Sequence, residues 1–560
     1  MYTFVDPLYR ARQLFASEVA MVSEGLRLTY AEVWSRCRRL AGVLARLSVQ
    51  PGDRVAVLGL NSHRYLEIYL AVPASGRVVV PLNTRHAEPE LCYTLEDAGA
   101  RLLITDRDPG ALAKSVERVI SVPDDYERLL TASPEAELGV GVTEDTLAGL
   151  FYTGGTTGAS KGVMLSHRNL MANTVHWLVA LQQGREDVFL VMAPMFHAAG
   201  SVAVLATVWV GGRQVILPGF DPVAALDTIA AEGITVTLGV PTMIAAIAEE
   251  QLARPREVGT VRSVGHGGSP IATEVVRRAH TAFPRAEFIH LYGATEMAPL
   301  ATALRHEETL LDGDLARSCG RAVAGVDLRV VDTNGDELPP GKTGEVVVRG
   351  PNIMPGYWNK PEETSAVLRD GWYHSGDLGF MNAQGYLFLV DRVKDMIISG
   401  GENVYSTEVE EVLYLHPAVL EAAVFGVPDA RWGEAVHAVV VPRTGCEVDP
   451  TALIAFCRER IAGYKVPKQI DLRPDPLPKS GPGKVLKREL RRPSGPGRAR
   501  RSTSRGLLDA RRVIRTAPAP PPAAACRRRR ARPLECFPKF CSGGELTDKA
   551  PYDTGSIPHI

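Results

Sequence analysis

No apolar run in this 560-residue sequence approaches the roughly 20 residues that a helix needs to cross a bilayer. The N-terminal residues also lack a basic segment leading into an apolar stretch, which is the pattern of a secretion signal. We therefore expect a cytoplasmic protein without integral membrane association, and peripheral contact with a membrane stays open.

Cysteine is also scarce, and over most of the chain acidic residues outnumber basic ones. The eight cysteines show neither metal-ligand spacing nor the density of a disulfide scaffold, so we expect reduced thiols. The formal net charge of −1 divides into +11 for residues 491–560 and −12 for the residues before them. An acidic body does not fit a nucleic-acid-binding protein, so no nucleic-acid partner is expected.

Short apolar runs alternate with amphipathic stretches along most of the chain, which is typical of an α/β protein. We predict buried strands at 54–60 and 77–81, with helices at 28–44 and 62–72. A second set of βαβ units is predicted over residues 187–292, with strands at 214–217, 235–240 and 287–291. Two parallel-sheet subdomains are therefore expected.

The pattern becomes β-rich from about residue 324, where an Asn334-Gly335 turn stands between two apolar runs, so hairpins or a small β-barrel are predicted. We divide the chain into a large α/β domain (1–391), a small, mobile α+β domain (392–490) and a basic tail (491–560). The tail is rich in Arg, Pro and Ala and cannot bury enough apolar surface to fold alone, so it is expected to be disordered. A recruitment segment and an out-of-frame reading are its alternative interpretations.

The strongest single motif runs from Thr153 to Lys161 and reads Thr-Gly-Gly-Thr-Thr-Gly-Ala-Ser-Lys. Glycines let backbone N–H groups approach phosphate oxygens, hydroxyls donate further hydrogen bonds, and the lysine supplies a positive charge. It is not a Walker loop, because Ser160 precedes the lysine and Gly162 follows it. A plain surface loop is the alternative. The phosphate-binding residues predicted here are Thr153, Gly154, Gly155, Thr156, Thr157, Gly158 and Lys161.

Four further motifs follow in order along the chain. They are Tyr292-Gly-Ala-Thr-Glu296, the Ser-Gly-Asp377 turn, the Asp-Arg392-Val-Lys394 segment and the Gly-Pro-Gly-Lys484 loop. Together with the phosphate loop, they make residues from about 28 to 490 resemble the adenylate-forming superfamily. That superfamily comprises acyl-CoA synthetases, firefly-type luciferases and peptide-synthetase adenylation domains.

The resemblance implies a site for ATP and Mg²⁺. The phosphate loop would grip the β- and γ-phosphates, with Gly154 and Ser160 in place of more usual residues. Tyr292 would pack on adenine, Thr295 would bond the α-phosphate and Glu296 would hold Mg²⁺. A π face, a hydroxyl donor and a hard oxygen ligand suit these three roles.

The resemblance also assigns the ribose contacts and the lysine of the chemical step. Asp377 would accept hydrogen bonds from both ribose hydroxyls, as a carboxylate can, and Arg392 would make a second ribose contact. Lys484 is implied as the adenylation lysine, a cation that stabilises the meeting of a carboxylate with the α-phosphate. Lys394 matches the hinge between the two domains. Further AMP contacts are implied for Gly268, Ser269, Gly293 and Asn403.

The residues after the hinge resemble the thioester-forming face of CoA ligases. Gly400 and Gly401 would let the pantetheine arm of coenzyme A pass close to the backbone, beside Glu402. Near the adenylation lysine, Lys479 and Lys487 are expected to be only solvated.

The acid is expected between residues 194–200, 239–243 and 265–270, where small residues and apolar walls suit a hydrophobic acid. The pocket residues predicted are His197, Gly239, Thr242, Gly265 and Gly267. His197 either gates this pocket or packs in the core, and His266 is a weaker candidate. A medium- or long-chain fatty acid is the expected substrate, and aryl acids of the coumarate, ferulate or benzoate type are the alternative.

The predicted function is that of an ATP-dependent acyl-CoA synthetase, whose partners are a small carboxylic acid, ATP and coenzyme A. The enzyme would form acyl-AMP, release pyrophosphate and pass the acyl group to CoA. A fatty acyl-AMP ligase that delivers to a carrier protein is one alternative, but the insertion typical of such relatives is not seen between Gly344 and Asp391. An inactive nucleotide-binding or scaffold protein is the alternative of a different class, and the joint presence of all five motifs argues against it.

Overall fold

The computed structural model describes residues 3–153, 160–269, 271–306, 311–392, 395–400, 402–429, 431–443, 445–446, 448–479 and 485–491. The predicted basic tail lies outside this range except for Arg491. Among the described residues, no helix is long and apolar enough to cross a membrane.

The first sheet has seven strands in the order β18-β8-β7-β4-β3-β5-β6. Its central parallel strands β3 and β4 are Val-rich and buried, as expected for strands covered on both faces. A capping box begins helix α2 (Tyr30–Arg46): the Thr29 hydroxyl accepts from the Glu32 N–H, and the Glu32 carboxylate accepts from the Thr29 N–H over 2.7 Å. The strands are β3 (Arg54–Leu58), β4 (Val78–Pro81), β5 (Ala100–Thr105), β6 (Arg118–Ser121), β7 (Leu147–Thr153), β8 (Lys161–Ser166) and β18 (Gly356–Tyr357); the helices are α2 (Tyr30–Arg46), α3 (His63–Ala74), α4 (Glu88–Ala98) and α5 (Asp124–Ala132).

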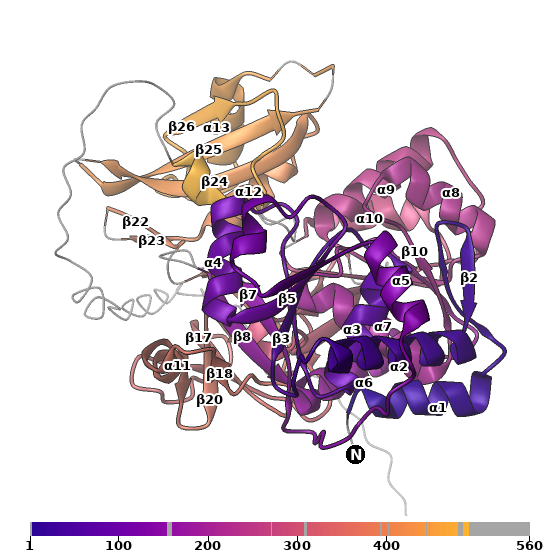
Figure 1. Cartoon of the computed structure of the whole chain (residues 1–560). Coiled ribbons are helices and arrows are strands. Elements are labelled where there is room, and N and C mark those ends of the chain that lie inside the picture. Colours follow the sequence, from indigo (N-terminus) through magenta and orange to yellow (C-terminus); the bar gives the residue numbers. More distant parts are fainter. Residues whose placement is uncertain are drawn as a thin grey trace, which may run out of the picture. The chain divides into compact units, whose positions relative to one another are not determined.

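The second sheet has nine strands in the order β15-β14-β13-β12-β11-β9-β10-β1-β2. Figure 1 shows α8, α9 and α10 grouped together, and their apolar side chains form one core with one face of this sheet. Helices α6 and α7 contribute to the core on its other face. The strands are β1 (Val19–Ser23), β2 (Leu26–Thr29), β9 (Val188–Val191), β10 (Arg213–Ile216), β11 (Val236–Gly239), β12 (Ser263–Gly267), β13 (Glu287–Tyr292), β14 (Thr302–His306) and β15 (Arg321–Ala322); the helices are α1 (Val5–Phe15), α6 (His167–Leu181), α7 (Ala198–Val210), α8 (Pro222–Glu232), α9 (Pro241–Ala253) and α10 (Thr273–Ala282).

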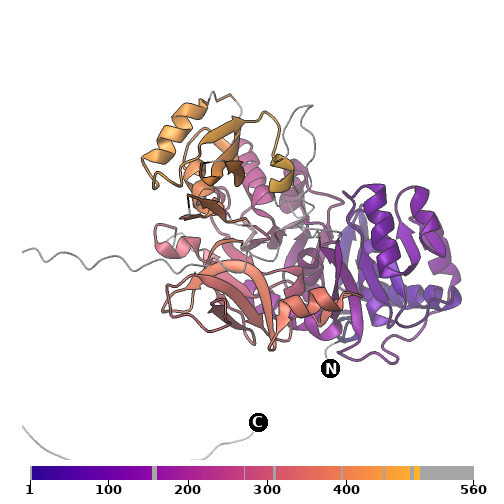
Figure 2. The ribbon, with the colours of Figure 1, turned by 90° about the vertical axis from the view of Figure 1, so that its left-hand side faces the viewer.

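The β-rich segment forms a third sheet of five antiparallel strands. Figure 2 shows this sheet, in salmon, as strongly curved. Its elements are β16 (Asp327–Val331), β17 (Gly344–Arg349), α11 (Pro361–Val367), β19 (Leu368–Arg369), β20 (Trp372–Met381) and β21 (Leu387–Arg392).

The C-terminal α+β part has a core of its own, which includes Val409, Val424, Val436 and Leu453. A large α/β part with several sheets is thus followed by a smaller C-terminal domain, and the predicted fold class is confirmed. The small domain contains β22 (Ile397–Ser399), β23 (Glu402–Val404), α12 (Ser406–Tyr414), β24 (Val419–Asp429), β25 (Gly433–Pro442), α13 (Pro450–Arg458), β26 (Gln469–Leu472) and α14 (Lys487–Leu490).

Candidate nucleotide and acyl site

Four of the predicted site segments follow neighbouring strands of the second sheet. The strands β13, β12, β11 and β9 are adjacent and parallel. Residues 293–296, 268–269, 240–243 and 194–200 follow their carboxyl ends in that order. Parallel strands end at one edge of their sheet, where ligands of open α/β sheets bind. The structure therefore brings the predicted adenylate and acyl segments to one sheet edge.

Three residues predicted for the nucleoside form a connected group. The Tyr292 hydroxyl donates to Asp377 Oδ2 over 2.8 Å, and Arg392 Nε lies 2.9 Å from Asp377 Oδ1. Asp377 and Arg392 face each other in the β20–β21 ladder. Because a carboxylate has about four lone-pair sites, both Asp377 oxygens keep acceptor capacity after these contacts.

The charge states within this group follow from burial and from the carboxylate. Burial, and then the Asp377 carboxylate, raise the pKa of Tyr292 well above its usual value, so the phenol stays protonated and donates. Burial is the largest single influence and lowers the pKa of Arg392, but Asp377, together with Tyr292, Tyr373 and Asp395, outweighs burial, so the pKa is raised. The guanidinium therefore keeps its positive charge beside Asp377.

Gly293 allows the sharp turn that follows Tyr292. A Cβ at this position would lie 1.7 Å from the Pro299 carbonyl oxygen, so any side chain would collide with the backbone. The Ala301 N–H donates to the Tyr292 carbonyl over 2.8 Å and closes the turn. Thr295 and Glu296 are half-buried within it.

The two ends of the phosphate loop are held in register, since Thr153 and Lys161 are paired across the β7–β8 ladder. The loop residues Gly154, Gly155, Thr156, Thr157 and Gly158 lie outside the described residues. Lys161 Nζ lies 5.1 Å from the centroid of the Tyr357 ring, and the Tyr357 hydroxyl donates to Glu296 Oε1 over 2.9 Å. The Tyr357 side chain thus contacts both Lys161, at the start of β8, and Glu296, in the turn after β13.

Sequence reasoning missed Tyr357 and a second contact group beside the loop. Asp97 Oδ2 accepts from the Tyr152 hydroxyl over 2.7 Å, and Asp97 Oδ1 lies 2.9 Å from Lys360 Nζ. The Tyr93 hydroxyl donates to the Ser160 carbonyl over 3.1 Å. These contacts join residues far apart in sequence, so no local motif predicts them.

The Glu296 carboxylate suits Mg²⁺ bound together with a nucleotide. Within the described ranges, no group of three or more His, Cys, Asp or Glu residues could hold a metal ion by itself. Mg²⁺ is usually held by one or two carboxylates with substrate phosphates and water. One half-buried carboxylate, whose partner Tyr357 also contacts the Lys161 ammonium, fits that arrangement.

The glycines predicted for the acyl pocket lie where neighbouring strands and side chains approach closely. A Cβ on Gly267 would lie 2.2 Å from the Leu291 carbonyl oxygen. A Cβ on Gly265 would lie 3.2 Å from Leu291 Cδ1, and one on Gly239 would lie 3.0 Å from Ile244 Cδ1. Close packing against β13 and α9 thus accounts for these glycines. Thr242 lies in the first turn of α9.

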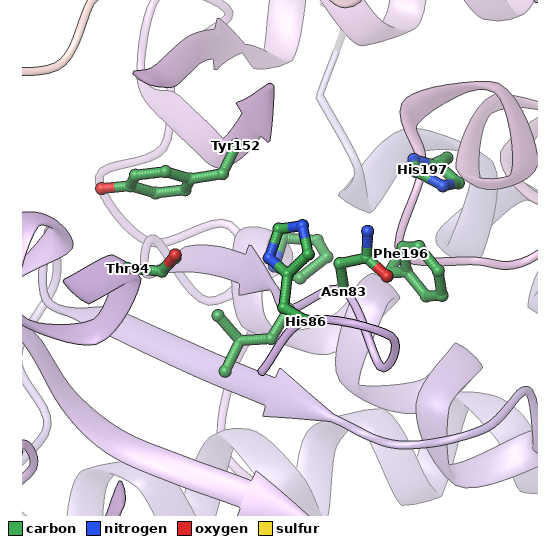
Figure 3. A pocket seen from close by; sticks show the side chains of 8 residues that line it. Asn83, His86, Thr94, Tyr152, Phe196 and His197 are labelled. Atoms are coloured by element: carbon green, nitrogen blue, oxygen red, sulfur yellow. The ribbon is translucent and has the colours of Figure 1, made fainter. Parts of the chain in front are cut away.

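His197 lies at a small pocket beside the phosphate-loop strand. The pocket has a volume of about 10 Å³, and β4, α4, β7 and the residues before α7 contribute to its walls. Figure 3 shows His86 in the middle, with Thr94 and Tyr152 on one side and Asn83, Phe196 and His197 on the other. A cavity of this size holds about one water molecule.

His266 is a core residue and not a wall of the pocket. Its ring is fully buried and stacks on His290 with centroids 5.1 Å apart, and His306 is 5.3 Å away. Burial lowers the pKa of His290 to about 4 and that of His266 well below its usual value. Burial, and then nearby histidines, lower the pKa of His306 to about 3.

In the C-terminal domain, Gly400 has φ +64°, and its N–H donates to the Trp432 carbonyl over 2.8 Å. A Cβ there would lie 3.0 Å from Trp432 Cε3, so the ring covers the glycine. Glu402 and Asn403 are exposed on β23, whereas Gly401, Lys394 and Lys484 lie outside the described residues.

The prediction that Lys479 and Lys487 are only solvated is wrong. Lys479 pairs with Glu421, and Lys487 Nζ lies 2.7 Å from Glu410 Oε1 and donates to the Ser406 hydroxyl over 2.6 Å. Buried carboxylates need a partner, and these ammonium groups provide it. The two lysines flank the segment that carries Lys484.

The chain matches the model of the AMP-binding enzyme over residues 8–358 and that of the AMP-binding enzyme C-terminal domain over 408–484. Feruloyl-CoA synthase of an Amycolatopsis species is 42% identical over 87% of this chain and 98% of its own. Fatty acid–[acyl-carrier-protein] ligase ScoC of Streptomyces coeruleorubidus is 36% identical over 84% and 92%. The structure of o-succinylbenzoate coenzyme A synthetase (MenE) of Bacillus subtilis with ATP and magnesium ion gives a TM-score of 0.78 at 31% identity, over 87% and 99%.

The fold, the family models and the ligases among these relatives together identify an AMP-forming ligase. The chain belongs to the AMP-binding enzyme family, and the resemblance drawn from its sequence is confirmed.

Proposed function

We propose that this enzyme activates an aromatic carboxylic acid of the hydroxycinnamate type as acyl-AMP and transfers the acyl group to coenzyme A. The observation that carries the proposal is the 42% identity to a feruloyl-CoA synthase over 98% of that protein's length. Identity to the fatty acid ligase ScoC is 36%. The comparisons thus favour the aromatic alternative over the fatty-acid substrate that the sequence led us to expect.

In the first half-reaction, a carboxylate oxygen attacks the α-phosphorus of ATP, and pyrophosphate leaves. The Tyr292–Asp377–Arg392 group would hold the nucleoside, and Lys161 would bind the phosphates. Lys484 would stabilise the charge that builds up where the two anions meet. Glu296 would hold Mg²⁺, which would neutralise charge on the phosphates. The structure of MenE in complex with ATP and magnesium ion supports the proposal that ATP and Mg²⁺ bind here.

In the second half-reaction, the CoA sulfur attacks the acyl carbonyl, AMP leaves with the bridging oxygen, and the thiol proton passes to water. We assign the thioester face to Gly400, Gly401 and Glu402, in a mobile domain of residues 392–490 that turns about Lys394. The surface beside Gly400 has features that suit the nucleotide part of CoA. Arg431 Cζ and Lys468 Nζ lie 4.6 and 5.7 Å from the Trp432 ring centroid, so an aromatic face stands among cations suited to phosphate groups.

Delivery of the acyl group to a carrier protein is the second candidate, because ScoC is named for that acceptor. CoA and a phosphopantetheinylated carrier offer the same thiol. They differ in the nucleotide, which the surface around Trp432 would contact.

A matrix of acids and acceptors tests the proposal. Ferulate, p-coumarate, benzoate, octanoate and palmitate are each supplied with ATP, Mg²⁺ and either CoA or a phosphopantetheinylated carrier protein, and the thioesters are measured by mass spectrometry. We expect kcat/KM for ferulate with CoA to exceed that for octanoate by about tenfold or more, as pocket contacts to a ring allow. Palmitate as the best acid would contradict the aromatic assignment, and thioester on the carrier alone would contradict the CoA assignment.

A further inference from the structure

The backbone of Tyr357 is fixed beside the phosphate loop. In strand β18, Tyr357 pairs with Val163 of β8, two residues after Lys161. The Tyr357 N–H donates to the Thr364 hydroxyl over 2.9 Å, and the N–H of Trp358 donates to the Gly162 carbonyl over 2.8 Å. The side chain of Tyr357 therefore starts from a well-defined position.

This side chain makes one contact to each of two motifs. Its hydroxyl donates to Glu296 Oε1 over 2.9 Å, and its ring centroid lies 5.1 Å from Lys161 Nζ. Only 7% of Tyr357 is exposed. The hydrogen bond from the phenol keeps one carboxylate oxygen of Glu296 engaged. This hydrogen bond also fixes the orientation of the carboxylate as a whole, and hence of its other oxygen.

We propose that Tyr357 is a positioning residue for the metal–nucleotide complex: its hydroxyl orients the Glu296 carboxylate for Mg²⁺, and its ring holds the Lys161 ammonium beside the phosphates. The proposal rests on the roles proposed above for Glu296 and Lys161. Tyr357 thereby connects the start of β8 in the first sheet to the turn after β13 in the second. Partners behind a metal ligand commonly change metal affinity by about 10- to 100-fold when they are removed.

Two substitutions separate the hydroxyl from the ring. Tyr357→Phe keeps the ring over Lys161 and removes only the hydrogen bond, whereas Tyr357→Leu removes both contacts. Binding of ATP is measured by calorimetry without acid or CoA, once with Mg²⁺ and once with EDTA. We expect Tyr357→Phe to weaken binding of Mg–ATP about tenfold and to leave metal-free ATP binding unchanged. Tyr357→Leu should weaken binding under both conditions.

Tyr126→Phe is the matched control. The Tyr126 hydroxyl donates to Glu67 Oε2 over 2.9 Å in a buried setting between α5 and α3, away from the nucleotide motifs. The control loses the same kind of hydrogen bond and should lower the melting temperature without changing either ATP affinity. Equal Mg–ATP affinity of Tyr357→Phe and wild type, or equal losses with and without Mg²⁺, would overturn the proposal.

Glu296→Gln distinguishes failure of this proposal from failure of the metal assignment beneath it. If Glu296→Gln weakens Mg–ATP binding and Tyr357→Phe does not, only the role of Tyr357 is refuted. If Glu296→Gln leaves Mg–ATP binding unchanged, the metal role of Glu296 is refuted and the proposal falls with it. We expect the double variant Glu296→Gln/Tyr357→Phe to bind Mg–ATP no more weakly than Glu296→Gln alone, because the Tyr357 hydroxyl acts through the Glu296 carboxylate.

Discussion

The phenol of Tyr292 donates a hydrogen bond of 2.8 Å to the carboxylate of Asp377, 85 residues further along the chain. This bond connects the carboxyl end of β13 in the second sheet to β20 in the antiparallel sheet. The aromatic ring proposed for adenine and the carboxylate proposed for ribose are thereby held in a fixed relation. The nucleoside would therefore meet a preorganised surface.

Replacing Asp377 tests whether its carboxylate contributes to nucleoside binding. Asp377→Asn keeps the shape but removes the charge that pairs with Arg392, and we expect ATP affinity to fall about tenfold, as for a lost charge-assisted hydrogen bond. Tyr292→Phe keeps the ring and the carboxylate, and we expect a smaller loss. Calorimetric titration of both variants with ATP measures the difference. Wild-type affinity in Asp377→Asn would refute the ribose role.

Lys484 should be needed for only one half-reaction. We expect Lys484→Ala to lower acid-dependent ATP–pyrophosphate exchange by about 100-fold or more, since the cation acts where carboxylate meets phosphate. Thioester formation from supplied feruloyl-AMP should persist. Lys487→Met is the control, because it leaves Glu410 without its 2.7 Å partner and should lower the melting temperature without selecting one half-reaction. Equal loss of both half-reactions in a folded Lys484→Ala protein would refute the assignment.

Lys394 is proposed as the hinge about which the small domain turns. Proline there would fix φ near −65° and restrict Val393, so one orientation would be locked. We expect Lys394→Pro to retain much of the pyrophosphate exchange and to lose most thioester formation, whereas Lys394→Ala affects both mildly. Wild-type acyl-CoA formation by the proline variant would show that no such turn is needed.

The buried histidines should make stability depend on pH. In the unfolded chain, imidazole takes up a proton near pH 6.5, whereas the folded-state pKa of His290 is about 4. The unfolded state thus binds more protons between these pH values. As the pH is lowered through this range, the free energy of unfolding should therefore decrease by up to about 1.4 kcal/mol per pH unit for each histidine. Urea titrations from pH 7 to 4 should show a shallower fall for His266→Leu than for wild type. Identical slopes would contradict this account.

Most of the fold could be predicted from local sequence. The strand prediction at 54–60 corresponds to β3, the helix prediction at 62–72 to α3, and 214–217 overlaps β10. The sequence does not predict the N-terminal strand β1, and its parallel pairing with β10 joins Met21 to Gln214, 193 residues further along the chain. Strand β2 also occupies residues where the helix was expected to begin. Such pairings depend on long-range packing, which periodicity does not report.

The candidate site was predictable where one short segment carries a whole role. The adenylate turn and the Asp377 turn were found because the required residue types are close in sequence. Tyr357 and Asp97 carry no such local signal, because only the packing of distant segments brings their partners to them. The ion pairs of Lys479 and Lys487 were missed for the same reason. Identity of the acid depends on pocket depth, which residue types alone do not define.

The central claim is that an aromatic acid passes through an acyl-adenylate on its way to CoA, and transfer of a carboxylate oxygen tests it most directly. The enzyme is incubated with ferulate labelled with ¹⁸O in both carboxyl oxygens, ATP, Mg²⁺ and CoA, and the products are examined by mass spectrometry. Attack on the α-phosphorus predicts one ¹⁸O in AMP, none in pyrophosphate and one in the feruloyl thioester. Label in inorganic phosphate with ADP as the other product, or feruloyl-CoA formed with unlabelled AMP, would contradict the account.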